Sequence, residues 1–216
     1  MIPNQWLEYT LHEDIELEGN PHPDQVYRCL EMLDPHNVKV VIVGLSPYPN
    51  IKDCSGIAFA TPTPRRYDDL PFSLKVMAWQ LYKQYNIDRY EGNLDSTLIS
   101  WVRQGVLLYN TALTCLPSNP TAHIDRWKKF SKTLLTNLKY THNPIIWTLG
   151  KHAAETITGD FHSVHPAALA YNKKIKFTPY FKQIAELYKQ RYDMPLDWLL
   201  QTDIKNFSYG TRYVSV

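Results

Sequence analysis

Cysteine is scarce in this 216-residue chain, and neither sign of charge dominates. The three cysteines, Cys29, Cys54 and Cys115, include no Cys-x-x-Cys pair and leave one residue over. This excludes a disulfide framework and a four-cysteine iron–sulfur site, and it favours a reducing compartment. The formal net charge is only +2, so any site for nucleic acid must be a local patch and not a polycationic surface.

Long hydrophobic runs are missing as well. No apolar segment approaches the roughly 18 residues that span a bilayer. The N-terminal segment Met1–Trp6 lacks the charged and apolar regions of a signal peptide. These absences predict a soluble, intracellular protein of the cytoplasm. The length predicts a single domain over residues 1–216, with a solvated helical lead-in at 1–37 and a C-terminal tail at 193–216 of unknown role.

Short β-branched and aliphatic segments predict buried strands. Three such segments occur, at 38–43, 106–109 and 144–149. Helices are predicted at 24–33, 74–85 and 179–192, with Ser73 as the N-cap of the second. Strands that alternate with helices indicate an α/β fold with a mainly parallel sheet. In such a sheet, ligands bind at the carboxyl ends of the strands.

The segment that follows the first predicted strand, residues 44–60, is organised for binding. Pro47 and Pro49 fix the backbone angle φ and stiffen the loop. Tyr48 and Phe59 therefore project from a rigid support. Rigid aromatic side chains on such a loop suit a flat apolar ligand such as a nucleobase.

Two further residues stand at positions where chemistry is expected. Asn110 lies at the carboxyl end of the strand predicted at 106–109. Its side-chain amide offers one acceptor and two donors, so it can pair with the polar edge of a nucleobase. The alternative is an asparagine that caps a strand–loop junction. His165 follows a short strand-like run and precedes Pro166 directly, and a purely structural histidine is the alternative there.

Three motifs together resemble the uracil-DNA glycosylase superfamily, most closely its family 1. Residues 44–59 resemble the motif Gly-Gln-Asp-Pro-Tyr-His, followed after a gap of equal length by Gly-Leu-x-Phe-Ser. Residues 101–114 resemble Trp-Ala-Arg-Gln-Gly-Val-Leu-Leu-Leu-Asn-Ala-x-Leu-Thr, and residues 165–169 resemble His-Pro-Ser-Pro-Leu. The resemblance covers roughly residues 38–190, with the motifs in the family's order.

The resemblance implies a three-layer α/β/α fold around a central, mainly parallel four-stranded sheet. It implies hydrolysis of the N-glycosidic bond of uracil after the base is flipped out of DNA, without a metal or other cofactor. His165 would donate a hydrogen bond to uracil O2, in a pocket formed by Leu45, Tyr48, Phe59 and Asn110. The implied contacts with DNA are Pro47, Ser73, Gly150, Lys151, Pro166, Ala167 and Leu169, the last as a wedge in the duplex.

Ser46 departs from the resemblance, because it occupies the position of the family's catalytic aspartate. A serine cannot place a negative charge beside the sugar cation or strongly activate water. Asp53, in the same loop, is a candidate substitute, and a solvated surface aspartate is the alternative. Two functions stay open. One is a glycosylase with reduced or altered activity, and the other is a catalytically silent DNA-binding protein, replication accessory or reader of a modified base.

The expected partners follow from these two functions. They are single- or double-stranded DNA containing uracil, a protein inhibitor of uracil glycosylases, or replication proteins such as those served by the family's poxvirus branch. A monomer is expected. Arg65 and Arg66, in a proline-rich connection, are predicted to be exposed and, with Lys151, to lie near phosphates. His123 is predicted to be a surface or capping residue ahead of a helix that Trp127 packs against the sheet.

Overall fold

Four parallel strands form the centre of the molecule. The computed structural model describes the chain except for residues 12–14, 89–91, 93, 173 and 201–216. The strands are β1 (Val40–Gly44), β2 (Val106–Asn110), β3 (Ile145–Leu149) and β4 (Phe161–Ser163), in the sheet order β2-β1-β3-β4. All three pairings are parallel, which confirms the predicted sheet.

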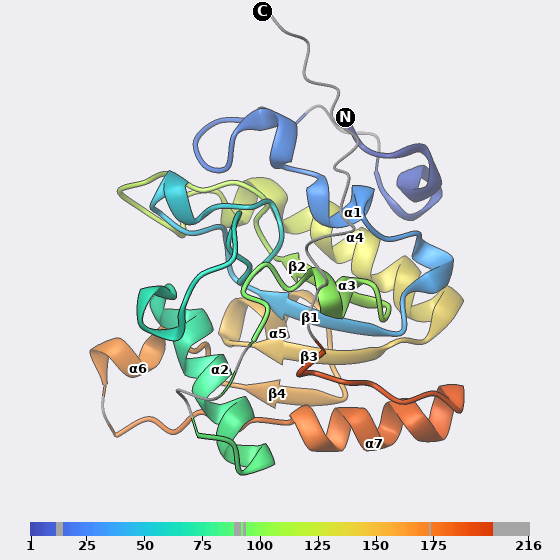
Figure 1. Cartoon of the computed structure of the whole chain (residues 1–216). Helices are drawn as coiled ribbons and strands as arrows, with labels where there is room; N and C mark the ends of the chain where they lie inside the picture. Colours follow the sequence, from blue (N-terminus) through green and yellow to red (C-terminus); the bar gives the residue numbers. More distant parts are fainter. Residues whose placement is uncertain (12–14, 89–91, 93, 173, 201–216) are drawn as a thin grey trace, which may run out of the picture.

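Helices cover both faces of this sheet (Figure 1). One face carries α2 (Phe72–Tyr85), α3 (Ile99–Val102) and α7 (Phe181–Tyr192). The other carries α1 (Arg28–Glu31), α4 (Ile124–His142) and α5 (Lys151–Thr156), while α6 (Ala168–Tyr171) lies at the edge to which the strands point. Short 3-10 turns occur at η1 (Asn4–Tyr9), η2 (Pro23–Gln25), η3 (Pro35–Asn37), η4 (Ile51–Asp53) and η5 (Tyr67–Asp69). The three-layer α/β/α architecture is therefore confirmed.

Aromatic side chains build the layer between the sheet and α7. Trp147 of β3 meets Phe181 edge-on, with ring centroids 5.1 Å apart. Trp101 packs against Trp198 at 4.8 Å and donates its indole N–H to the carbonyl of that residue. Edge-to-face pairs of this kind add to the stabilisation that burial alone provides. Trp198 thus fastens the segment after α7 to the core.

The opposite layer is built around α4. Trp127 and Phe130 are fully buried and pack against Tyr27, with centroids 6.0 and 6.3 Å from its ring. The hydroxyls of Tyr109 and Ser131 form a hydrogen bond between β2 and α4. Trp127 thus packs α4 against the segment before α1, and Ser131 joins α4 to the sheet.

The solvated lead-in predicted for residues 1–37 is wrong. Trp6 is fully buried, and its indole N–H donates to the carbonyls of Leu30 and Leu33 at 2.8 and 3.0 Å. The helix predicted over 24–33 is reduced to η2 and α1, because part of its backbone bonds elsewhere. The N–H of Cys29, for example, donates to the carbonyl of Gly56. The N-terminal segment is therefore packed onto the core.

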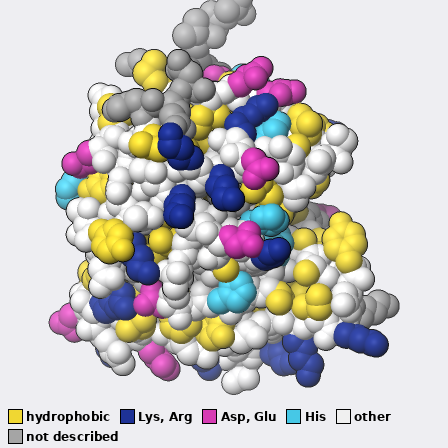
Figure 2. Space-filling view, turned by 180° about the vertical axis from the view of Figure 1, so that it is seen from behind, with side chains coloured by type: hydrophobic (Ala, Val, Ile, Leu, Met, Phe, Trp, Pro, Cys, Tyr) yellow, Lys and Arg dark blue, Asp and Glu magenta, His cyan; other side chains and the backbone are white. Residues whose placement is uncertain are grey.

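The rear of the molecule carries charge of both signs. The outer face of α4 exposes basic residues, among them Arg126, Lys128 and Lys132. In the rear view, acidic side chains are interspersed with the Lys and Arg side chains (Figure 2). No described helix is long and apolar enough to cross a bilayer, and all three cysteines are buried with free thiols.

Candidate active site

The carboxyl ends of β1 and β2 bring Gly44 and Asn110 side by side. A Cβ added to Gly44 would lie 2.6 Å from Asn110 Oδ1 and 2.8 Å from the ring of Phe59. Only glycine therefore allows both side chains to converge over the end of β1. The Asn110 side chain forms no hydrogen bond with another described residue. The residue is only 8% exposed and lines the cavity at this edge, so its amide is available to a ligand.

A cavity of about 380 Å³ opens at this edge of the sheet. Nine of the residues predicted for the site line it, namely Leu45, Ser46, Pro47, Tyr48, Phe59, Ser73, Asn110, His165 and Ala167. Its described lining contains no Asp, Glu, Lys or Arg side chain. The cavity therefore suits a neutral, flat ligand that offers hydrogen-bonding groups.

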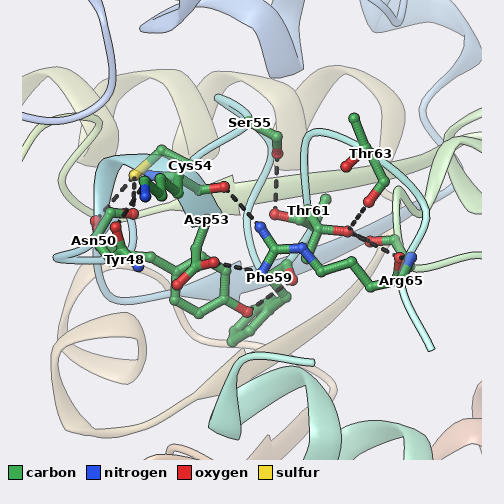
Figure 3. A network of polar contacts seen from close by, with 12 residues as sticks. Tyr48, Asn50, Asp53, Cys54, Ser55, Phe59, Thr61, Thr63 and Arg65 are labelled. Atoms are coloured by element: carbon green, nitrogen blue, oxygen red, sulfur yellow. Dashed lines mark hydrogen bonds and ion pairs between the residues drawn. The ribbon is translucent and has the colours of Figure 1, made fainter. Parts of the chain in front are cut away.

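Tyr48 and Phe59 are held to each other by the loop between them. The Tyr48 hydroxyl donates to the carbonyl of Phe59 at 2.7 Å (Figure 3). Burial raises the pKa of Tyr48 far above its ordinary value, so the hydroxyl keeps its proton. Phe59 has a φ of 66°, in the left-handed region that non-glycine residues seldom adopt. Strain of this kind is typical of functional sites, where the surrounding structure enforces it.

His165 lies against Phe59, with ring centroids 5.9 Å apart. Burial lowers its pKa from 6.5 to about 4, so the ring is neutral at pH 7. The backbone N–H of Ala167 donates to its Nδ1 at 3.2 Å, which leaves the ring proton on Nε2. The absence of a side chain at Gly150 makes room, since an added Cβ would lie 2.9 Å from His165 Cβ. The site thus holds a neutral histidine with a proton to donate.

The remaining residues predicted for DNA contact surround the cavity without lining it. Gly150 and Lys151, at the start of α5, border an adjoining groove that shares His165 with the cavity. The Lys151 side chain is 82% exposed and pairs with Glu155 at 3.7 Å. Pro166 is buried, and Leu169 is partly buried against the core.

Comparison with known proteins agrees with this geometry. The sequence profile of the Uracil DNA glycosylase superfamily matches residues 31–189. The chain belongs to this superfamily. A uracil-DNA glycosylase of Mycoplasma genitalium is 30% identical over 202 residues, which cover 88% of this chain and 80% of that protein.

Solved structures of superfamily members have the same fold. The mimivirus uracil-DNA glycosylase aligns with a TM-score of 0.67 and 25% identity, covering 83% of this chain and 74% of the mimivirus chain. A variant of the mimivirus protein in complex with UGI aligns with a TM-score of 0.68 and 24% identity, over 83% of this chain and 75% of the other.

Asp53 forms an ion pair with a nearby arginine. Its carboxylate forms an ion pair with the guanidinium of Arg65, and the two side chains are only 19% and 22% exposed (Figure 3). Arg65 also donates to the carbonyl of Lys52 at 2.7 Å. Asp53 does not line the cavity. The predictions of a solvated Asp53 and an exposed Arg65 were wrong, because the two side chains pair with each other and are largely buried.

Replacing Asp53 by asparagine should lower the free energy of unfolding by about 1.5–3 kcal/mol, because the charged hydrogen bond to Arg65 is lost. Uracil release should stay within a few-fold of the parent. Urea unfolding followed by tryptophan fluorescence measures the first effect. Asp68→Asn, at an exposed position in η5, is the matched control. An inactive Asp53→Asn protein of parental stability would instead place Asp53 in the chemistry.

Ser73 was predicted to be the N-cap of α2, but the structure places it inside that helix. Pro71, with a φ of −54°, already occupies the N-cap position, and α2 begins at Phe72. Because the helix starts two residues early, Ser73 lies within its first turn. There its side chain is buried and lines the cavity. The N-terminus of α2 is therefore directed at the site, and helix N-termini attract anions.

His123 is neither a surface residue nor a side-chain cap. It occupies the N-cap position of α4 but makes no capping bond, and it is only 3% exposed. Its Nδ1 pairs with the hydroxyl of Thr114 at 2.9 Å, and that hydroxyl also accepts the indole N–H of Trp127. His123 thus ties the loop after β2 to α4.

Several parts of the cavity lining were missed from the sequence. They include Val26 and Cys29 in or near α1, Leu113 after β2, the turn at 119–121, and Tyr171, which is 91% exposed at the end of α6. Tyr171 stands six residues after His165 and two residues beyond the third motif. An aromatic residue so close to a functional histidine was the available signal.

Proposed function

We propose that this chain is a uracil-DNA glycosylase that hydrolyses the N-glycosidic bond of uracil in DNA and leaves an abasic site, as in DNA repair. The observation that carries the proposal is the convergence of three groups on one uncharged cavity. These are the unpaired amide of Asn110, the neutral ring of His165 and the aromatic pair Tyr48 and Phe59. The relatives that the chain resembles bear the same name.

The groups in the cavity match the charges that develop during the reaction. Breaking the bond from C1′ to N1 makes the sugar cation-like and the base anion-like. His165 Nε2–H donates to uracil O2 as negative charge arrives there, and an oriented donor of this kind is worth about 3–4 kcal/mol in the transition state. Phe59 stacks on the base, Asn110 reads its polar edge, and Tyr48 occupies the space beside C5, where the methyl group of thymine would clash.

Ser46 takes the position at which the matched motif has an aspartate. Its hydroxyl lines the cavity, and no described carboxylate lies there with it. The hydroxyl can orient a water molecule but can neither remove its proton strongly nor offset the charge of the sugar cation. Departure of the base, assisted by His165, therefore supplies most of the rate enhancement, and addition of water is atypically weak.

DNA lies along the carboxyl edge of the sheet in this proposal. The N-terminus of α2 at Ser73, the loop at Pro47 and Ala167, and the start of α5 at Gly150 and Lys151 contact phosphates. Leu169 follows the base-binding histidine, as the wedge of the third motif does. The protein acts as a single-domain monomer, because one chain supplies every group. A protein inhibitor such as UGI would bind the same edge.

A silent reader of DNA is the less favoured alternative. Binding alone requires neither a neutral histidine with a free N–H nor a strained Phe59 at the cavity. The deciding experiment is incubation with an oligonucleotide that contains one uracil, followed by alkali. Strand scission at the uracil is expected, and binding without scission would overturn the proposal in favour of the reader.

Replacing Asn110 by aspartate should lower the preference for uracil over cytosine about 10- to 100-fold, because a carboxylate accepts from the cytosine amino group and cannot donate to uracil O4. Release of both bases from matched oligonucleotides measures the ratio. Asn119→Asp is the control, since it makes the same chemical change at the exposed rim of the cavity. An unchanged ratio in a folded Asn110→Asp protein would remove Asn110 from base recognition.

A further inference from the structure

One exposed aromatic side chain lines the cavity, and a second belongs to the residue next to a lining residue. Tyr171, in α6, is 91% exposed and lines the cavity itself. Phe72, the first residue of α2, is 47% exposed and directly precedes Ser73, which also lines the cavity. Figure 1 places α6 and the first turn of α2 at the same edge, the one to which the strand arrows point.

This placement contrasts with the rest of the fold. Tryptophan, tyrosine and phenylalanine side chains mostly lie in the two layers that pack on the sheet. In the rear view, apolar side chains gather at the edge where α6 lies (Figure 2).

We propose that Phe72 and Tyr171 are stacking platforms for the two nucleotides that flank the extruded uracil in single-stranded DNA. The inference rests on the proposed function, because the cavity between the two rings is taken as the uracil site. The platforms hold the single strand on both sides of the extruded base. They bind bases of any identity, since every base presents a π-face.

The bases that flank the uracil expose different amounts of their surface in single-stranded and in duplex DNA. In a single strand the faces of the flanking bases are open, whereas in a duplex they are covered by their neighbours. The cavity carries no described charged side chain and the net charge is only +2, so phosphate attraction is a local contribution. Stacking adds to that contribution, and removal of one ring weakens binding roughly 5- to 100-fold per base.

The test compares Phe72→Ala and Tyr171→Ala on three substrates. These are a single-stranded oligonucleotide with one uracil, the same strand with abasic residues on both sides of the uracil, and the duplex. The KM of each variant should rise roughly 5- to 100-fold on the first substrate, with kcat nearly unchanged. On the strand with abasic flanks, parent and variants should have equal KM values, because there is no base to stack.

Two exposed aromatic residues provide matched controls. Trp79→Ala removes a ring that is 44% exposed, two turns further along α2 from Phe72. Tyr140→Ala removes a ring that is 85% exposed near the C-terminal end of α4. Neither control should alter the KM. A parental KM for both Phe72→Ala and Tyr171→Ala, or an equal loss on the strand with abasic flanks, would overturn the proposal.

A binding measurement separates this inference from the proposed function. Fluorescence anisotropy with a labelled single strand that contains uracil reports affinity whether or not the base is released. If the parent releases no uracil, the proposed function fails, and weaker binding by the two variants would still support the stacking role. If the parent releases uracil and both variants bind like the parent, the stacking role alone fails.

Discussion

Replacement of His165 by alanine is expected to slow uracil release about 10²–10³-fold, while binding of DNA persists. The neutral ring lies against Phe59, and its Nδ1 is occupied by the N–H of Ala167, so Nε2–H is the available donor. This hydrogen bond strengthens only as charge reaches uracil O2. Its loss should therefore appear in kcat and leave the KM nearly unchanged. Single-turnover release from a uracil oligonucleotide measures the effect.

His162→Ala is the matched control for this experiment. His162 is an exposed histidine of β4 that borders the adjoining groove and not the cavity, and its Nδ1 pairs with the hydroxyl of Thr148. The control should release uracil at nearly the parental rate. A parental rate for a folded His165→Ala protein would contradict the assignment of His165, and an equal loss in both variants would point to damage of the fold.

The pH dependence of the parent tests the charge state of His165. Its pKa of about 4 keeps the ring neutral above pH 5, so its titration should leave the rate flat between pH 5 and 8. The unfolded chain binds a proton at this histidine below about pH 6.5, whereas the folded protein does so only near pH 4. The free energy of unfolding should therefore fall as the pH decreases through that window. If the rate of uracil release changed with a midpoint near pH 6.5, and did so only when His165 is present, the His165 ring would be charged during the reaction.

Replacement of Ser46 by aspartate is expected to increase the rate of uracil release. A positioned general base is commonly worth on the order of 10²–10⁴-fold. We expect a gain toward the lower end, because the loop of residues 44–60 is built around a serine. The described lining contains no other carboxylate, and Asp53 is held by Arg65, so no existing group should mask the effect. The measurement is single-turnover release with excess protein.

The control for this variant is Ser46→Asn, which has nearly the shape of the aspartate without its charge. It should not exceed the parental rate. Burial can raise the pKa of the new carboxyl group. The gain should then grow with pH as that group ionises, which a profile from pH 5 to 9 would reveal. No gain at any pH in a folded Ser46→Asp protein would mean that water does not approach from this position.

The sequence was sufficient to predict the layered core and most of the residues that line the cavity. The runs that became β1, β2 and β3 are too apolar to be anything but buried strands, and a parallel sheet gathers the loops that follow its strands at one edge. The resemblance to the family predicted Ser46, Asn110 and His165 in one site, and the parallel sheet explains why residues so distant along the chain lie in one cavity. The sequence also determined the rigidity of the loop that carries Tyr48, because Pro47 and Pro49 act locally.

Tertiary structure decided what depends on partners distant along the chain. Asp53 and Arg65 are polar and lie among prolines, and nothing local to either predicts that each neutralises the other. His123 is buried because Thr114 and α4 enclose it, and Trp6 is buried because the carbonyls of Leu30 and Leu33 accept its N–H. The exposure of Tyr171 at the cavity was likewise not determined by the sequence. A helix of only four residues is too short to show a hydrophobic periodicity that would predict its exposed side. In each case the outcome depended on whether a polar or aromatic side chain is buried. That depends on how distant segments of the chain pack together in the folded protein.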